Sequence, residues 1–132
     1  MNQDSYYKDL SHLGFQDRTS YNFDHPKSID VNLFEKHIKK LSMGESINTP
    51  SYDFTKHIRL KKTNYISNAN LIIIDGIFAL HYEQLHKFYC IKIYVETPKK
   101  LRLQRRIDRD TKQRGRTIKS VLKQYNTTVE TM

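Results

Sequence analysis

The spacing of apolar residues first predicts an amphipathic helix over residues 31–41. Apolar side chains recur there at the three- and four-residue intervals of a single helical face, namely Val31, Phe34, Ile38 and Leu41. Gly44 follows closely. Glycine commonly ends a helix because it adopts the left-handed backbone conformation at no steric cost, so the helix is expected to stop there.

Two later segments predict β-strands. Residues 70–75 (NLIIID) form a continuous, largely β-branched run, which is typical of a strand buried on both faces of a parallel sheet. Residues 91–95 (IKIYV) place Ile, Ile and Val at alternate positions, which indicates a strand with one more exposed face. Residues 78–88 between them predict a helix. The three segments therefore predict a β-α-β unit with a right-handed crossover.

Two further helices are predicted near the C-terminus. Thr97 and Pro98 suit an N-cap followed by proline at the first helical position, and Gly115 ends or interrupts the helix that they open. Beyond Gly115, a last apolar stripe consists of Ile118, Val121, Leu122, Tyr125 and Val129. The order of elements predicts an α/β fold.

The composition is that of one globular domain. The 132 residues are 37% hydrophobic and 28% charged, which excludes a disordered or fibrous chain. No apolar run approaches the roughly 20 residues that span a bilayer, so no membrane partner is expected. The first residues, MNQDSYYKDL, lack the apolar region of a signal peptide, and Cys90 is the only cysteine. These features predict a cytoplasmic protein without an internal disulfide.

The positive charge is concentrated at the C-terminal end. Of the formal net charge of +9, residues 97–132 carry +8, from eleven lysines and arginines against three acids. Such a block favours an anionic partner: nucleic acid, an acidic membrane surface or a phosphate-bearing small ligand. Charge alone does not choose among these.

Arginine dominates this basic block. Arg102, Arg105, Arg106 and Arg109 form a helical stripe, which Arg114 and Arg116 continue around Gly115. Guanidinium groups bind phosphate oxygens bidentately and stay charged beside other cations. The pattern suits a lid that closes over a polyphosphate, and it equally suits a solvated amphipathic helix.

Three other stretches carry candidate chemistry. Asp75-Gly76 ends the isoleucine-rich run, where a carboxylate could hold magnesium beside a nucleotide phosphate or simply form a turn. Residues 21–26 (YNFDHP) and 52–57 (YDFTKH) are rich in aromatic, acidic and histidine side chains. Their rings could stack on a nucleobase while an aspartate binds ribose hydroxyls, or they could cover the edge of a core.

The combination of motifs resembles the uridine/cytidine kinases, a family of P-loop nucleoside kinases. The matching stretches, in chain order, are QDSYY (3–7), NFDHP (22–26), YDFTKHIR (52–59), IIIDGI (72–77), RRIDRDTKQRGR (105–116) and QYNTTVETM (124–132). The resemblance covers the chain almost from end to end. It implies a partial doubly wound parallel sheet and transfer of the γ-phosphoryl group of ATP or GTP, with Mg²⁺, to the 5′-hydroxyl of uridine or cytidine in pyrimidine salvage. Phosphoribulokinase-like relatives are a second possibility within this class, and the YDFTKH stretch favours a pyrimidine.

The resemblance also implies a role for individual residues. Asp4 would be the general base, and Asp4 and Asp75 would hold magnesium. The nucleoside would contact Tyr7, Phe23, Asp24, Tyr52, His57, Arg106, Arg116 and Gln124, with Asp24 on the ribose and Tyr52 and His57 on the pyrimidine edge. The phosphates would contact Arg109 and Arg114.

Two departures from the family pattern shape the expected function. The family usually has Glu-Gly where this chain has Asp75-Gly76. No GxxxxGK[ST] phosphate loop occurs, and the four glycines (14, 44, 76 and 115) are too far apart to form one. We therefore expect one incomplete kinase domain, truncated before and including the P-loop and inactive alone. Its parts would be a nucleoside-binding part (about 1–66), a core (about 70–96) and a basic lid (about 97–132).

Other functions and assemblies remain open. The chain could be a regulatory partner of full-length kinase subunits, or a small basic RNA-binding protein. Against RNA binding, the aromatic residues concentrate before residue 95 and the arginines after it, whereas a stacking platform interleaves the two. The resemblance implies a homo-oligomer, specifically a tetramer.

Overall fold

Helix α2 (Val31–Ser42) forms where the hydrophobic spacing predicts it, in a computed structural model that describes residues 1–129. The Asp30 side chain caps its first turn by accepting the N–H of Leu33 at 3.2 Å. Its buried residues are Phe34, Ile38 and Leu41. Gly44, with a φ of 78°, follows the last turn, so the predicted end of the helix is confirmed.

The chain divides into two compact units, and we describe each by itself. The first unit is Met1–Lys92, and the second begins at Ile93. The predicted division into nucleoside-binding, core and lid parts follows function rather than packing, and it stays a prediction. The last three residues of the predicted lid part, 130–132, lie outside the described residues.

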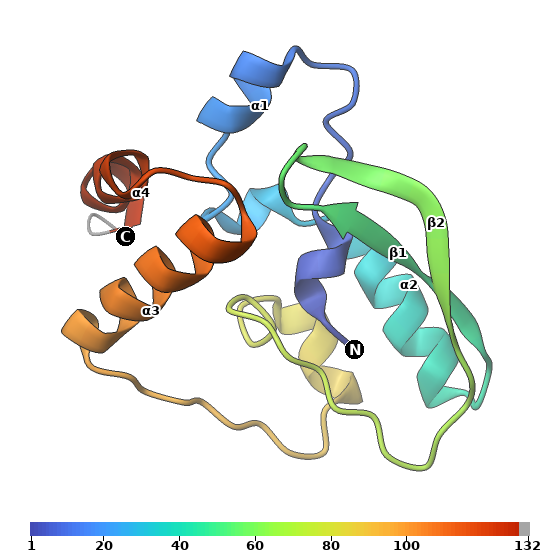
Figure 1. Ribbon diagram of the computed structural model, residues 1–132. Coiled ribbons are helices and arrows are strands. Elements are labelled where there is room, and N and C mark those ends of the chain that lie inside the picture. Colours follow the sequence, from blue (N-terminus) through green and yellow to red (C-terminus); the bar gives the residue numbers. More distant parts are fainter. Residues whose placement is uncertain (130–132) are drawn as a thin grey trace. The chain divides into compact units, whose positions relative to one another are not determined.

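The first unit contains a β-hairpin that the sequence pattern does not predict. Strand β1 (Ile47–Asp53) pairs antiparallel with β2 (Ile58–Ile66) beside helix α2, as Figure 1 shows. The register shifts between Pro50 and Ser51, because proline has no N–H to give to a ladder. Strand β2 is exposed along most of its length, so it lacks the alternation of apolar and polar residues that identifies strands in a sequence.

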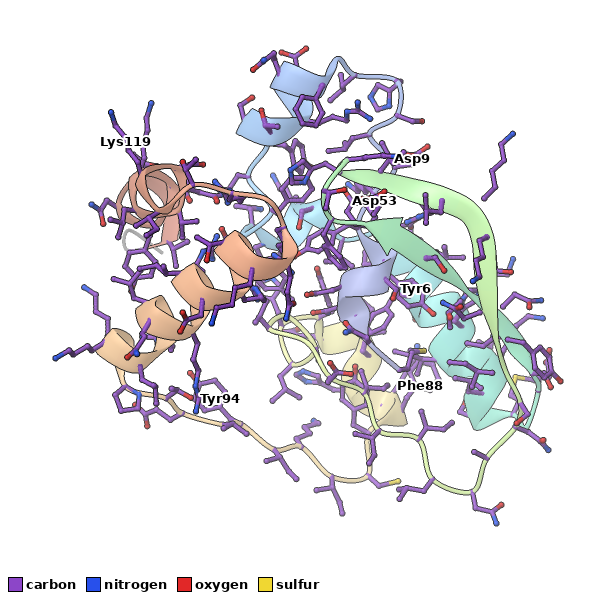
Figure 2. All side chains as sticks on the ribbon, viewed as in Figure 1. Tyr6, Asp9, Asp53, Phe88, Tyr94 and Lys119 are labelled. Carbon is purple, nitrogen blue, oxygen red and sulfur yellow. The ribbon has the colours of Figure 1, made fainter. Side chains whose placement is uncertain are left out.

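The first unit also contains four short helices among its described residues. They are η1 (Gln3–Tyr6), α1 (Phe15–Ser20), η2 (Pro26–Ser28) and η3 (Glu83–Phe88). The buried hydrophobic cluster consists of Tyr6, Tyr7, Ile29, Phe34, Ile38, Tyr52 and Leu85. Tyr6, the last residue of η1 (Figure 2), packs against Phe34 of α2, and its hydroxyl lies 2.9 Å from His37 Nδ1. The core thus joins η1, the hairpin and α2.

The predicted strand over residues 70–75 is wrong. Only a parallel bridge between Asn2 and Asp75 forms there, with hydrogen bonds from Asp75 N–H to the Met1 carbonyl (3.1 Å) and from Gln3 N–H to the Asp75 carbonyl (2.8 Å). A strand in the middle of a sheet needs a hydrogen-bonded neighbour on each edge, and within residues 1–129 this segment has one short neighbour. Leu71 and Ile73 consequently remain 77% and 71% exposed.

The predictions that follow along the chain are also corrected. Residues 91–95 form no strand, and Ile91, Ile93, Tyr94 and Val95 are exposed. Figure 2 shows Tyr94 on this extended segment before helix α3. The predicted helix over 78–88 is reduced to the 3₁₀ helix η3. A β-α-β unit is therefore not formed by residues 70–95.

The second unit consists of the predicted C-terminal helices. Helix α3 (Lys99–Gln113) begins one residue later than predicted, with Pro98 at the N-cap position, and it stops before Gly115, whose φ is 64°. Helix α4 (Ile118–Gln124) is capped by Thr117 and continues into the π-helical turn η4 (Tyr125–Val129). The buried side chains of this last stretch are Val121 and Tyr125.

The mixed helix-and-strand class predicted from the sequence is confirmed, with a two-stranded antiparallel sheet in the part of the chain that the structure describes. Over the same residues, no helix is both long and apolar enough to cross a bilayer.

Candidate functional site

Four of the predicted nucleoside-binding residues gather in one aromatic cluster in the first unit. The Tyr7 ring centroid lies 5.3 Å from that of Phe23 and 5.4 Å from that of Tyr52. The His57 ring stacks on Phe23, with centroids 4.9 Å apart and planes 19° from parallel. Phe54, which the sequence reasoning did not assign to the site, joins at 5.3 Å from Tyr52. Side chains from three distant segments thus form one patch of π-systems.

The turn of the hairpin sets the place of His57. Asp53 Oδ1 accepts hydrogen bonds from the N–H groups of Thr55 (2.9 Å) and Lys56 (3.0 Å), and also from the Thr55 hydroxyl (2.6 Å). These bonds, that from the Thr55 hydroxyl foremost, hold the pKa of Asp53 below its ordinary value. His57 follows with a φ of 55°, a left-handed conformation that non-glycine residues rarely adopt.

The hydroxyl of Tyr52 is a polar group without a hydrogen-bond partner among the described residues. Its oxygen is buried within the aromatic cluster. Burial raises the pKa of the Tyr52 phenol, so the hydroxyl stays protonated and remains a donor. A buried polar group usually has a partner, and an unpaired one in an aromatic cluster is a natural contact for a ligand atom.

Arg59 holds the segment that carries Tyr7. Its guanidinium donates to the carbonyl of Tyr7 at 2.8 Å and to the Asp30 carboxylate at 3.2 Å. Its backbone N–H donates to Asp9 Oδ1 at 3.3 Å, and Figure 2 shows Asp9 and Asp53 at the turn end of the hairpin. Sequence reasoning included Arg59 in a motif but gave it no role, because these partners lie far away along the chain.

The predicted base and the predicted metal ligand lie on neighbouring segments. Asp4 is in η1, where its N–H donates to Asn2 Oδ1 at 2.7 Å, and the adjacent Gln3 is hydrogen-bonded to the backbone of Asp75. The Gln3 side chain is fully buried and accepts the N–H of Phe78 at 2.9 Å. The paired backbones therefore bring two carboxylate-bearing residues to the same part of the fold.

Glycine at position 76 is required by this arrangement. A Cβ placed on Gly76 would lie 2.4 Å from both Gln3 Cβ and Gln3 Oε1. That distance is far shorter than a van der Waals contact. The close approach of the two backbones after Asp75 therefore depends on the missing side chain.

Asp24 lies beside the aromatic cluster in sequence. Its N–H donates to Asn22 Oδ1 at 3.0 Å, and Phe23 lies between them. The predicted contact of the Asp24 carboxylate with ribose stays a prediction.

The predicted arginines form a second cluster, in the second unit, around a carboxylate that the sequence reasoning missed. Asp110 is 1% exposed, and its carboxylate lies 2.9 Å from Arg109 Nε. The other guanidinium nitrogens within 4 Å of it belong to Arg106 (3.8 Å), Arg114 (3.6 Å) and Arg116 (3.7 Å). Gln124 Oε1 accepts hydrogen bonds from Arg106 and Arg116. The spacing of four residues from Arg106 to Asp110, and again to Arg114, is the signal that could have identified Asp110.

The predicted magnesium site has two candidate protein ligands, Asp4 and Asp75, rather than a complete set. Within residues 1–129, no three or more histidine, cysteine or acidic side chains converge as a metal site. Mg²⁺ at nucleotide sites is commonly bound by one or two carboxylates together with substrate phosphates. Asp4 and Asp75 fit that smaller role. Their assignment to magnesium, like the assignment of all these side chains to one substrate, stays a prediction.

A family model and individual related proteins indicate the same family for this chain. The model of the phosphoribulokinase / uridine kinase family matches residues 1–131. The chain is 48% identical over 130 residues to a protein named uridine kinase from Clostridium novyi (strain NT), which covers 98% of this chain and 62% of that protein. It is 45% identical to a uridine kinase from Staphylococcus epidermidis and 44% identical to one from Clostridium perfringens, with 98% of the chain covered in both.

The chain spans about 62% of the length of these relatives. Its small sheet and helices are consistent with part of a P-loop kinase domain. With nearly the whole chain matched both by the family model and by relatives well above 30% identity, this chain belongs to the phosphoribulokinase / uridine kinase family.

Proposed function

We propose that this chain is the nucleoside-binding and lid part of a pyrimidine nucleoside kinase. The reaction is transfer of the γ-phosphoryl group of ATP or GTP to the 5′-hydroxyl of uridine or cytidine, in cytoplasmic pyrimidine salvage. The observation that carries the proposal is the aromatic cluster of Tyr7, Phe23, Tyr52 and His57 with the unpaired Tyr52 hydroxyl inside it. The names of the relatives, uridine kinase, support the same substrate class.

The aromatic cluster suits a nucleobase in two ways. Its ring faces offer stacking to a planar base, and base–aromatic stacking contributes about 1–3 kcal/mol per base. The Tyr52 hydroxyl and the His57 imidazole offer polar contacts to a base edge. A site built to hydrogen-bond one edge rejects a base that leaves these groups unpaired. Asp24, next to Phe23, accepts hydrogen bonds from the ribose hydroxyls.

Asp4 acts as the base of the reaction. The oxygen of the 5′-hydroxyl forms a bond to the γ-phosphorus while the bond between that phosphorus and the β,γ-bridging oxygen breaks. The hydroxyl proton passes to the Asp4 carboxylate, and the nucleoside diphosphate leaves with the bond's electron pair. Magnesium held by Asp4 and Asp75 would neutralise charge on the phosphate oxygens. A second base or acid is not needed for this balance.

The arginine cluster supplies positive charge for the phosphates and for the nucleoside monophosphate product. Arg109 and Arg114 bind phosphate oxygens, and Arg106, Arg116 and Gln124 belong to the same cluster in the second unit. Guanidinium groups are well suited to spread phosphate charge during phosphoryl transfer. A homo-oligomer, as the resemblance implies, is part of the same proposal.

The 132-residue polypeptide by itself binds nucleoside but does not catalyse its phosphorylation. Its sequence contains no glycine-rich loop to align the γ-phosphoryl group for in-line attack. In a radiolabel assay with ATP and uridine, formation of uridine monophosphate should stay at background. Turnover above background would show that other residues replace such a loop.

Nucleoside binding by the same polypeptide tests the proposal directly. Calorimetric titration should detect uridine and cytidine but not adenosine. Tyr52→Phe removes the unpaired hydroxyl and should weaken uridine binding about tenfold, since a lost hydrogen bond of this kind costs about 1–3 kcal/mol.

Tyr65→Phe is the matched control. Tyr65 lies in the same hairpin, but it is 68% exposed and its hydroxyl bonds to Ser46. Equal effects of the two substitutions, or equal binding of adenosine and uridine, would contradict the proposed base site.

A further inference from the structure

Asp110 brings together positive charges that otherwise repel one another. Four guanidinium groups lie within 4 Å of its carboxylate. Two come from helix α3 and two from the loop that follows it. With one carboxylate among them, the group keeps a net charge of about +3, and like charges this close separate unless something between them offsets the repulsion.

The backbone of Asp110 holds the same loop. Its carbonyl accepts the N–H of Arg116 at 3.1 Å, and Gly115, with its left-handed φ of 64°, lets the chain turn back onto the last turn of α3. Asp110 therefore contacts residues 114–116 in two ways: its main-chain carbonyl accepts the Arg116 N–H, and its carboxylate pairs with the Arg114 and Arg116 guanidinium groups. Neither contact involves the other unit of the molecule.

The Asp110 carboxylate is more buried than the arginine side chains around it. The Asp110 side chain is 1% exposed, whereas the Arg109 side chain is 42% exposed and those of Arg106, Arg114 and Arg116 are 16%, 23% and 22% exposed. The accessible surface of the cluster is therefore that of the arginines rather than that of the carboxylate.

We propose that Asp110 is a positioning residue that holds Arg106, Arg109, Arg114 and Arg116 as a single site for a polyphosphate chain. Its buried carboxylate fixes the four guanidinium groups, and the parts of the arginine side chains that are accessible bind the anion. This inference rests on the proposed function, because it names what organises the phosphate-binding arginines of that reaction.

The proposal and simple electrostatics predict opposite results for one substitution. Asp110→Asn removes a negative charge from the middle of an anion site. If charge alone mattered, polyphosphate would bind more tightly. If Asp110 positions the arginines, the variant loses the arrangement, and polyphosphate binds more weakly although the net charge has risen.

Titration of inorganic tripolyphosphate into the 132-residue chain tests this. We expect Asp110→Asn to weaken binding about tenfold, as loss of charge-assisted contacts would do. Asp108→Asn is the matched control: it removes the same charge from the same helix, but Asp108 is 58% exposed and pairs with Lys112. The control should bind within about twofold of the unchanged chain. Equal or tighter binding by Asp110→Asn would overturn the proposal.

A measurement on the unchanged chain covers the case in which Asp110→Asn does not fold. The side-chain Nε–H signals of the four arginines should shift together in NMR spectra, at one tripolyphosphate midpoint. Shifts with separate midpoints, or an absence of tripolyphosphate binding, would also overturn the proposal. The nucleoside titration involves the other unit, so uridine binding with failed tripolyphosphate binding would reject Asp110's role while leaving the base site intact.

Discussion

The aromatic cluster of the first unit and the arginine cluster of the second gather side chains from separate segments by different forces. The first is made of neutral rings in contact, such as Phe23 stacked on His57, and one cation, Arg59, secures its backbone. The second is made almost wholly of like charges around one carboxylate, Asp110. Contacts between neutral rings do not depend on salt, whereas the attraction of an exposed cation for an anion falls off over about 10 Å at 0.1 M salt.

This difference suggests that the two clusters have different roles in binding. A cluster of packed rings has its shape before a ligand arrives, so it suits discrimination among bases. A cluster of cations is held against its own repulsion and gains most when an anion arrives, so it suits binding of phosphates. Substitutions that separate the two behaviours test the comparison.

The largest effect is expected at Arg59. Arg59→Met leaves the Asp30 carboxylate and the Tyr7 carbonyl without the cation that they share. Breaking a buried ion pair costs about 3–5 kcal/mol, and since these side chains are 20% and 32% exposed, we expect about 2–3 kcal/mol here. Urea unfolding monitored by tyrosine fluorescence measures the loss. Lys61→Met, at an exposed site on the same strand, should change stability by less than about 0.5 kcal/mol; a similar cost at both positions would show that Arg59 has no special role.

The next effect concerns His57. His57→Asn tolerates the left-handed backbone there but removes the ring that stacks on Phe23. Uridine binding should weaken about ten- to a hundredfold, the range for losing a buried polar contact. Tripolyphosphate binding should stay unchanged, because it depends on the second unit. If both affinities fell together in calorimetry, His57 would be a structural residue and the two clusters would not be independent.

The smallest effect is a pH dependence of stability from His37. Burial lowers the pKa of His37, and Lys36, Lys40 and Arg59 add repulsion to the charged imidazole. Histidine in the unfolded chain titrates near 6.5, so below that pH the unfolded state binds more protons than the folded state. Stability should be full above about pH 6.5 and fall as the pH drops towards the lower folded pKa.

Urea unfolding between pH 5 and 7.5 measures this fall. His37→Gln should flatten the profile over that range, and His12→Gln, at an exposed site, should leave it unchanged. An identical slope in the His37 variant would assign the dependence to other groups. The hydrogen-bonded carboxylate of Asp53 does not contribute in this window, because its pKa lies below the ordinary value of 3.8.

Local patterns predicted helix α2 correctly, but the strand that they predicted over residues 70–75 does not form. The spacing of Phe34, Ile38 and Leu41 places them on one helical face whatever surrounds them, and helix α2 forms with those residues buried. The β-branched run at 71–74 also has a strong propensity, but a strand exists only through its partners, and this segment has too few. Conversely, Lys61 and Lys62 lie in a strand whose exposed positions carry no hydrophobic signal.

Candidate site residues could be predicted only where the sequence carries motifs that resemble those of the family. The resemblance selected Tyr7, Phe23, Tyr52 and His57, and these rings lie together in the structure, while their contact with a nucleoside stays a prediction. The residues that hold them were not predicted. Arg59 acts on partners about 30 and 50 positions away, and Asp110 is one acid in a basic stretch, where a solvated ion pair is the ordinary expectation.

The contact between Gly76 and Gln3 limits the order in which this sequence can change. A side chain at position 76 would lie 2.4 Å from the Cβ of Gln3, an atom that every residue except glycine carries, so alanine at 76 is tolerable only after residue 3 has become glycine. A smaller residue 3 in turn leaves the Phe78 N–H without its acceptor. The two positions therefore form an epistatic pair in which each single step is unfavourable. We expect positions 3 and 76 to change together during evolution. A library of single substitutions would therefore find that neither position accepts replacement.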